Sequence, residues 1–174
     1  MQHHGAPTRL LDWTTSVYVA AYFACTQHLD KMGAIWVLHP YSLEQEMKTR
    51  YGFEGLPKSD KETEELFLEE DAPPVIVTFE RGNKTDRMIA QQGVFSVCRN
   101  VSVVQHQILA DVLTENSDMI RFIKLLIPAD RKVTFLRRLR AMNVTASSLF
   151  PGIDGLGRSI SELIKLCALA ENRS

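Results

Sequence analysis

Polar residues able to do chemistry are concentrated near the start of the chain, in the stretch MQHHGAPTRLLDWTTS. They directly precede the apolar run VYVAAYFAC, which is predicted to be a helix. The free backbone N–H groups at the start of a helix bind anions well, particularly when hydroxyl groups and an arginine lie nearby. The pattern therefore predicts a pocket for a phosphate-bearing ligand, formed by Arg9, Asp12, Thr14 and Ser16, with Trp13 as a stacking surface.

The same residues also fit a purely structural role, and their spacing leaves both interpretations open. Thr14, Thr15 and Ser16 carry hydroxyl groups that can cap the first turn of a helix. Asp12 precedes that turn, where a carboxylate is stabilised by the helix dipole. In this interpretation the cluster fixes the junction between a strand over residues 9–13 and a helix over residues 16–29.

A second polar cluster lies in RMIAQQGVF, which begins at Arg87. Arg87 and Gln91 are four residues apart, so a helical turn places them on one side. Gly93 permits a tight entry into the following strand. Two interpretations remain: the turn ends at Gly93 with Gln91 exposed, or Arg87 faces a binding cleft together with Gln91 or Gln92.

Several other kinds of chemistry lack support in the sequence. His3 and His4 are adjacent and point in different directions, and no third ligand follows at helical spacing, so we expect no metal site. Ser16 opens a helix and lacks the sharp turn that exposes a hydrolase nucleophile. The net charge of −1 provides no general attraction to nucleic acid or anionic membranes. No apolar run approaches the ~18 residues of a membrane span.

The three cysteines, Cys25, Cys98 and Cys167, lie far apart, each within an apolar segment. This spacing matches neither a disulfide framework nor a zinc site. It indicates buried thiols in a reducing compartment, so we expect a cytoplasmic protein.

A basic run, ADRKVTFLRRLRAM, predicts a helix over residues 129–142. Its apolar residues recur at helical spacing and predict one buried side, formed by Val133, Leu136, Leu139 and Met142. The cations are expected to face solvent or, alternatively, to contact a phosphate backbone. They are Arg131, Lys132, Arg137, Arg138 and Arg140.

Hydrophobic periodicity along the chain predicts one α+β domain, a small mixed or antiparallel sheet with flanking helices. The acidic stretch over residues 57–71 is expected to be a solvated loop or a short helix. The remaining strands are expected over 33–39, 73–79, 93–97 and 119–128, and the remaining helices over 42–53, 83–92, 106–113 and 159–170.

The C-terminal segment carries two further predictions. Residues 145–157 are expected to turn the chain before the last helix. Ser159 and Glu162 have the spacing of a capping box at the start of that helix. One apolar face of the helix is predicted from Ile160, Leu163, Ile164 and Cys167.

Three segments resemble the FRG domain family, in the family's order: QHHGAPTRLLDWTTSVYVAAYFAC, DRMIAQQGVF and MNVTASSLFPGIDGLGRSI. Together they span nearly the whole chain. The family is named for a Phe-Arg-Gly motif that precedes the first segment. FERG at Phe79–Gly82 follows that segment and contains the extra residue Glu80, so it is not equated with the motif. We therefore expect residues 1–174 to form a single FRG-like domain that is truncated at its N-terminus.

The resemblance in turn implies an ADP-ribosyltransferase-like fold of the Arg–Ser–Glu type, with NAD as the ligand. Thr14–Ser16 then take the place of the Ser-Thr-Ser element, and Gln91 and Gly93 stand where two acids are expected. The resemblance assigns Gln91 to the catalytic position. It assigns binding of NAD or a related nucleotide to His3, Arg9, Asp12, Thr14, Ser16 and Arg87.

Gln91 departs from the pattern of such enzymes. In ADP-ribosyl transfer a carboxylate stabilises the positive charge that develops on the ribose. A glutamine can hydrogen-bond the ribose hydroxyl, but it carries no charge and cannot act as a base. No catalytic glutamate is identified in the sequence, and we expect weak or no catalysis.

Two functional hypotheses follow. The first is a bacterial toxin or anti-phage defence effector with an NAD-binding, ADP-ribosyltransferase-like domain. The alternative is a non-enzymatic module that binds nucleic acid or a protein partner, with the basic helix as its contact surface. The loss of a core strand upstream would expose a sheet edge, through which we expect a second copy or another protein to pair.

Overall fold

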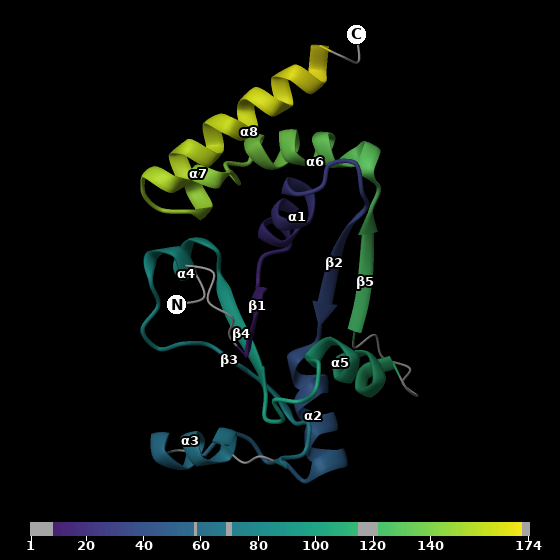
Figure 1. Ribbon diagram of the computed structural model, residues 1–174, viewed down its shortest axis with the longest axis vertical. Coiled ribbons are helices and arrows are strands. Elements are labelled where there is room, and N and C mark those ends of the chain that lie inside the picture. The colour runs from purple at the N-terminus through teal and green to yellow at the C-terminus, as the bar shows by residue number, and fades with distance from the viewer. Residues whose placement is uncertain (1–8, 58, 69–70, 115–121, 172–174) are drawn as a thin grey trace. The chain divides into compact units, whose positions relative to one another are not determined.

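A computed structural model of the 174-residue chain describes residues 9–57, 59–68, 71–114 and 122–171 (Figure 1). The chain divides into two compact units, each built from three separate segments. Unit 1 comprises Met1–Asp12, Trp36–Glu80 and Phe95–Lys124, and unit 2 comprises Trp13–Ile35, Arg81–Val94 and Leu125–Ser174.

The fold is α+β, with helices beside two small antiparallel sheets, which confirms the predicted class. One sheet has the strand order β1 (Leu10–Thr14), β4 (Gly93–Cys98), β3 (Ile76–Phe79). The other pairs β2 (Gly33–Leu38) with β5 (Phe122–Ile127). Each of these strands begins within five residues of a predicted strand, because runs of β-branched and aromatic residues favour the extended backbone.

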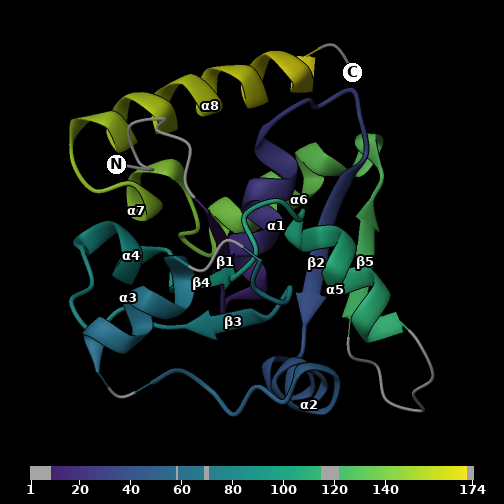
Figure 2. The same cartoon turned by 60° about the horizontal axis from the view of Figure 1, so that its bottom comes forward.

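Unit 1 contains α2 (Pro40–Tyr51), α3 (Asp60–Leu68) and α5 (Gln105–Thr114). Helix α2 packs against α5 and β3 (Figure 2). Its start is fixed by Pro40 in the first turn, and its end by Gly52, whose φ of 63° is favourable for glycine. The interior of the unit includes Leu43, Met47, Val75, Ile76 and Leu109.

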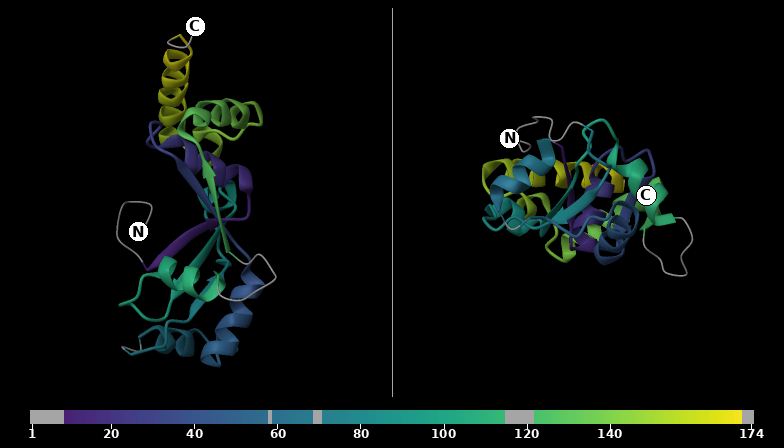
Figure 3. Two further views of the ribbon diagram at one scale, coloured as in Figure 1. Left: turned by 90° about the vertical axis from the view of Figure 1, so that its right-hand side faces the viewer. Right: turned by 90° about the horizontal axis from the view of Figure 1, so that it is seen from below.

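Unit 2 contains α1 (Val17–Thr26), α4 (Asp86–Ala90), α6 (Ala129–Ala141), α7 (Ala146–Leu149) and α8 (Ile153–Glu171). Helix α1 packs on α6, while α7 packs on both α8 and α4. The long helix α8, yellow in Figures 1 and 3, follows α7 and leads to the C-terminus. The core that joins these helices includes Val19, Tyr22, Cys25, Leu136, Leu139, Leu149 and Phe150.

A buried lysine links α6 to the end of α1. Lys132 is 2% exposed, and its Nζ donates hydrogen bonds to the carbonyl oxygens of Gln27 and His28 at 2.9 and 3.1 Å. The expectation that this cation faces solvent or a phosphate backbone is therefore wrong. The two carbonyls lie in the turn after α1, where His28 has a positive φ, so the helix ends at Thr26 and not at Leu29.

The C-terminal segment differs most from its prediction. Helix α8 begins at Ile153, so Ser159 is buried inside it and the predicted capping box with Glu162 is wrong. A capping box does form earlier, where Thr145 accepts a hydrogen bond from the N–H of Ser148 and Ser148 accepts one from the N–H of Thr145. The segment predicted to turn the chain thus contains α7 and the start of α8.

The apolar face predicted for the last helix is exposed. Ile160, Leu163 and Ile164 are 53%, 41% and 64% exposed, and Cys167 is also exposed. Leu166 of α8 is buried in the core of unit 2. The prediction of a buried thiol is therefore confirmed at Cys25 and Cys98 and is wrong at Cys167. The prediction that Met142 belongs to the buried side of α6 is also wrong, because Met142 is exposed just after the end of that helix.

No helix in the described ranges is long and apolar enough to cross a membrane.

Two glycines of α8 provide a matched test of its packing. A Cβ at residue 155 would overlap the carbonyl oxygen of Phe150, whereas a Cβ at residue 157 would meet nothing within 4 Å. We expect Gly155→Ala to lower the free energy of unfolding by about 1–3 kcal/mol through overpacking. Gly157→Ala should raise it by about 0.5–1 kcal/mol, because alanine favours the helix. Urea unfolding followed by circular dichroism measures both, and equal effects of the two changes would contradict this packing.

Candidate functional site

The junction between β1 and α1 forms as the sequence predicts. Ser16 is the N-cap of α1, and its hydroxyl accepts a hydrogen bond from the N–H of Val19 at 3.4 Å. The hydroxyl of Thr14 accepts a second one from the N–H of Ser16 at 3.1 Å. These bonds satisfy the side-chain oxygens locally and fix the direction in which α1 leaves the strand.

Only the last residues of the first polar cluster, Thr14 to Ser16, lie together with the second polar cluster in unit 2. Thr14 Oγ1 donates a hydrogen bond to the carbonyl oxygen of Gln91 at 2.8 Å, and the N–H of Thr15 donates to the carbonyl oxygen of Gln92 at 3.1 Å. The side chains of Thr15 and Gln92 are also joined, at 3.5 Å. Segments that are 77 residues apart in sequence are thereby held side by side.

Gln91 is the C-cap of the short helix α4, which begins after the N-cap Thr85. Its side-chain Nε2 donates a hydrogen bond to the carbonyl oxygen of Leu149 at 3.0 Å. The amide therefore connects α4 to α7. The backbone of Gln92 next to it has a φ of 49°, which completes the turn into β4.

Arg87, one helical turn before Gln91, lies against an aromatic ring that a second arginine also contacts. The guanidinium carbons of Arg87 and Arg158 are 4.8 and 4.6 Å from the centre of the Phe150 ring. Phe150 is 7% exposed. Cation–π contacts of this kind stabilise a guanidinium group but leave its N–H donors available in the plane.

The two arginines have no carboxylate partner within the described residues of unit 2. The Nε of Arg87 is buried and has no hydrogen-bond acceptor among the described residues. A buried donor without a partner costs about 1–3 kcal/mol, so such an atom is unusual in a folded protein. The arrangement has the donors and the charge that an anion requires.

A tyrosine and a glutamate lie beside this arginine pair. The hydroxyl of Tyr22 donates a short hydrogen bond to Glu162 Oε1, and Glu162 follows Arg158 by one helical turn. Burial of Tyr22, reinforced by the bond to Glu162, raises the pKa of the phenol well above its usual value. Tyr22 therefore stays protonated and remains the donor at any physiological pH.

Arg9, the first cation of the opening cluster, lies in unit 1. Its Nη2 donates to the carbonyl oxygens of Cys98 and Arg99 at 2.8 and 2.6 Å, and its Nη1 donates to that of Phe67 at 2.9 Å. The guanidinium is thus engaged by three backbone carbonyls. Asp12 is exposed in the same unit. His3 lies outside the described residues.

The described residues contain no group of three or more histidine, cysteine or acidic side chains arranged to hold a metal ion. The thiols of Cys25 and Cys98 are buried, and burial raises the pKa of both. They are poor nucleophiles at neutral pH, because the thiolate is the reactive form.

Comparison with known proteins gives one result. The FRG domain family model matches residues 1–32, a range that includes the β1–α1 junction. The resemblance of the opening segment to FRG domains is confirmed over those residues. No curated protein and no solved structure matches the chain.

Sequence reasoning singled out Thr14, Ser16, Arg87 and Gln91 as candidates but did not single out the aromatic and charged residues that lie beside them. These are Tyr22, Phe150, Arg158 and Glu162. An arginine in a helix is by itself a weak signal. The available clue was position, since Phe150 and Arg158 both occur in the third segment that resembles FRG domains.

The contacts of Arg9 predict a contribution to stability. Replacing Arg9 with methionine leaves three backbone carbonyls without their donor, so we expect the free energy of unfolding to fall by about 1–2 kcal/mol. Arg81 is exposed, and Arg81→Met serves as the matched control, with a change within about 0.5 kcal/mol. Urea denaturation measures both, and an Arg9→Met variant as stable as its control would show that these bonds contribute nothing.

Proposed function

We propose that unit 2 binds a nucleotide through its diphosphate group, with NAD as the ligand, in an ADP-ribosyltransferase-like site. The observation that carries the proposal is the pair of arginines on Phe150, one of which has a buried donor without an acceptor. Arginine suits this role because its planar fork of N–H groups matches two oxygens of a phosphate.

The β1–α1 junction supports the same ligand. Helix α1 has ten residues and no acidic side chain in its first turn, so its positive end is not neutralised locally. It is connected through Thr14 to Gln91, one helical turn from Arg87. The FRG match over residues 1–32 includes this junction.

The chemistry of Gln91 limits catalysis at this site. Gln91 is neutral, and its amide nitrogen donates to Leu149. It can orient a ribose hydroxyl but cannot stabilise a developing positive charge as a carboxylate does. The proposed activity is therefore NAD binding with slow transfer or hydrolysis, in a toxin or anti-phage defence effector.

Binding is tested by isothermal titration calorimetry with NAD, ADP-ribose and adenosine. We expect NAD and ADP-ribose to bind and adenosine, which lacks phosphates, not to bind. Arg87→Met and Arg158→Met should each weaken NAD binding at least ~10-fold, the loss of about 1.4 kcal/mol. Arg138→Met is the control, because Arg138 is exposed on α6 and should leave affinity unchanged.

Two outcomes contradict the binding proposal: no heat with NAD or ADP-ribose, or equal affinities of the Arg87→Met variant and its control. Binding of a short RNA in place of NAD, lost in an Arg137→Glu, Arg138→Glu variant, would favour the non-enzymatic alternative.

Turnover is tested separately by proton NMR of NAD incubated with the protein. Gln91→Ala should remove the residual formation of nicotinamide and weaken NAD binding only ~2- to 10-fold, the loss of one neutral hydrogen bond to the ribose. Gln92→Ala is the matched control. Turnover that persists in Gln91→Ala would exclude Gln91 from the reaction, and NAD binding without any turnover would identify a binding module.

A further inference from the structure

Strand β3, in unit 1, forms one edge of its sheet. The strand order is β1-β4-β3, so β3 pairs on one side with β4. Val77 lies opposite Val97 in the antiparallel register, and the N–H of Arg99 donates to the carbonyl oxygen of Val75 at 2.9 Å. Because backbone groups alternate in direction along a strand, Val75 and Val77 face β4, and the N–H and C=O groups of Ile76 and Thr78 point away from it.

The outward N–H of Ile76 has an unusual acceptor. It donates to Sδ of Met47, from α2, at 3.2 Å. Ile76 and Met47 are 2% and 1% exposed. A thioether is a weak acceptor, whereas the neighbouring strand of a sheet would offer a carbonyl oxygen at this position. Met47 therefore covers an edge donor without fully satisfying it.

A groove runs along this edge. It contains about 540 Å³ of empty space, part of it open to solvent, between α2, the chain at Phe53–Leu56, and Ile76–Thr78. Three consecutive residues of a strand line it. Successive side chains of a strand point to opposite faces of the sheet. A groove that touches Ile76, Val77 and Thr78 in turn therefore runs along the edge of the strand and not over one face of the sheet. Its walls are mainly apolar, with Leu43, Met47 and Leu56 among them.

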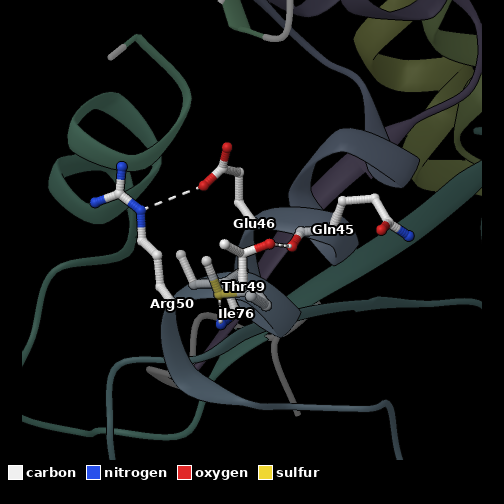
Figure 4. A network of polar contacts seen from close by, with 6 residues as sticks. Gln45, Glu46, Thr49, Arg50 and Ile76 are labelled. Carbon is white, nitrogen blue, oxygen red and sulfur yellow. Dashed lines mark hydrogen bonds and ion pairs between the residues drawn. The ribbon is translucent and has the colours of Figure 1, made fainter. Parts of the chain in front are cut away.

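One charged side chain, Glu44, lines the groove. Glu46, two residues further along α2, forms an ion pair with Arg50, whose Nε lies 3.3 Å from Glu46 Oε2 (Figure 4). Glu44, in contrast, has no ion pair among the described residues. Glu44 is exposed. It offers a negative charge without an ion-pair partner among the described residues, beside a channel whose other lining side chains are apolar except for Thr78.

We propose that the α2–β3 groove binds an extended peptide segment of another protein, which adds to β3 as a fourth strand. The Met47 side chain moves aside, and the N–H of Ile76 and the outward groups of Thr78 bond to the peptide backbone. Apolar side chains at alternate positions of the peptide occupy the channel, and a basic side chain lies near Glu44.

The walls favour a single strand over the edge of a second folded copy. Helix α2 contributes Pro40, Leu43, Glu44 and Met47 to one side of the groove, so the space beside β3 is enclosed by a helix. A lone extended chain fits between a helix and a strand edge, whereas a sheet of another molecule would bring its own neighbouring strands against α2. The proposal is independent of the nucleotide site.

Fluorescence polarisation with the full chain tests this inference. The probe is an N-acetylated octapeptide of alternating valine and lysine with a fluorophore at its C-terminus. Two matched control peptides have the same sequence: one carries N-methyl groups on the backbone amides of its lysines, the other on those of its valines. N-methylation removes backbone donors from one edge of the strand and keeps every side chain. We expect binding of the unmodified peptide and at least ~10-fold weaker binding of one methylated version, as lost edge pairing requires.

Three variants sharpen the test. Met47→Leu keeps the volume but removes the competing sulfur acceptor, so it should tighten peptide binding several-fold. Thr78→Pro removes an outward N–H without breaking the ladder to β4 and should abolish binding. Thr49→Ala, on the same helix but outside the groove lining, should leave binding unchanged.

The proposal is overturned if both methylated peptides bind as well as the parent, or if Met47→Leu leaves affinity unchanged or weaker. The methylated peptides and the Met47→Leu variant test the proposal even if Thr78→Pro disturbs folding, which circular dichroism would reveal. Concentration-dependent dimerisation in analytical ultracentrifugation, abolished by Thr78→Pro and competing with the peptide, would assign the groove to a second copy and overturn the proposal as well.

Discussion

The arrangement of unit 2 depends on the end of α7, at Leu149 and Phe150. The carbonyl oxygen of Phe150 lies where the Cβ of a side chain at position 155 would be, so α8 can approach α7 only because residue 155 is glycine. The carbonyl of the preceding Leu149 accepts the amide of Gln91, and the Phe150 ring contacts Arg87, Arg158 and, edge-on at 5.9 Å, Phe23. Four helices therefore take their positions from two consecutive residues. The candidate nucleotide site is assembled at the same point.

Secondary structure was largely predictable because most elements carry local signals. Ser16 before an apolar run marks the start of α1, and the Val- and Ile-rich runs mark the strands. Prediction failed where a tertiary contact decides the outcome. Lys132 looks like one cation of a solvated run, and only the two carbonyls after α1 make its burial favourable. The glycines at 155 and 157 indicate a turn locally, yet close packing on α7 keeps the chain helical there.

Only part of the candidate site, the β1–α1 junction together with Arg87 and Gln91, could be predicted from the sequence. The hydroxyls at the β1–α1 junction and the Arg87 and Gln91 spacing are visible in sequence, and the structure brings them together through Thr14. Phe150 and Arg158 have no comparable local pattern, since a single aromatic and a single helical arginine occur throughout globular proteins. The Met47 sulfur beside the N–H of Ile76 is likewise invisible in sequence, because it depends on which edge of β3 faces α2.

The three cysteines lie in unequal environments, which makes site-specific labelling of the protein possible. Cys25 and Cys98 are buried with raised pKa values, while Cys167 is exposed on α8. A maleimide reagent at neutral pH therefore has one accessible thiol, and a spectroscopic label enters at a single known place without any engineered substitution. Since Cys167 lies one turn from Leu163 on the exposed apolar face of α8, such a label would report on whatever covers that helix.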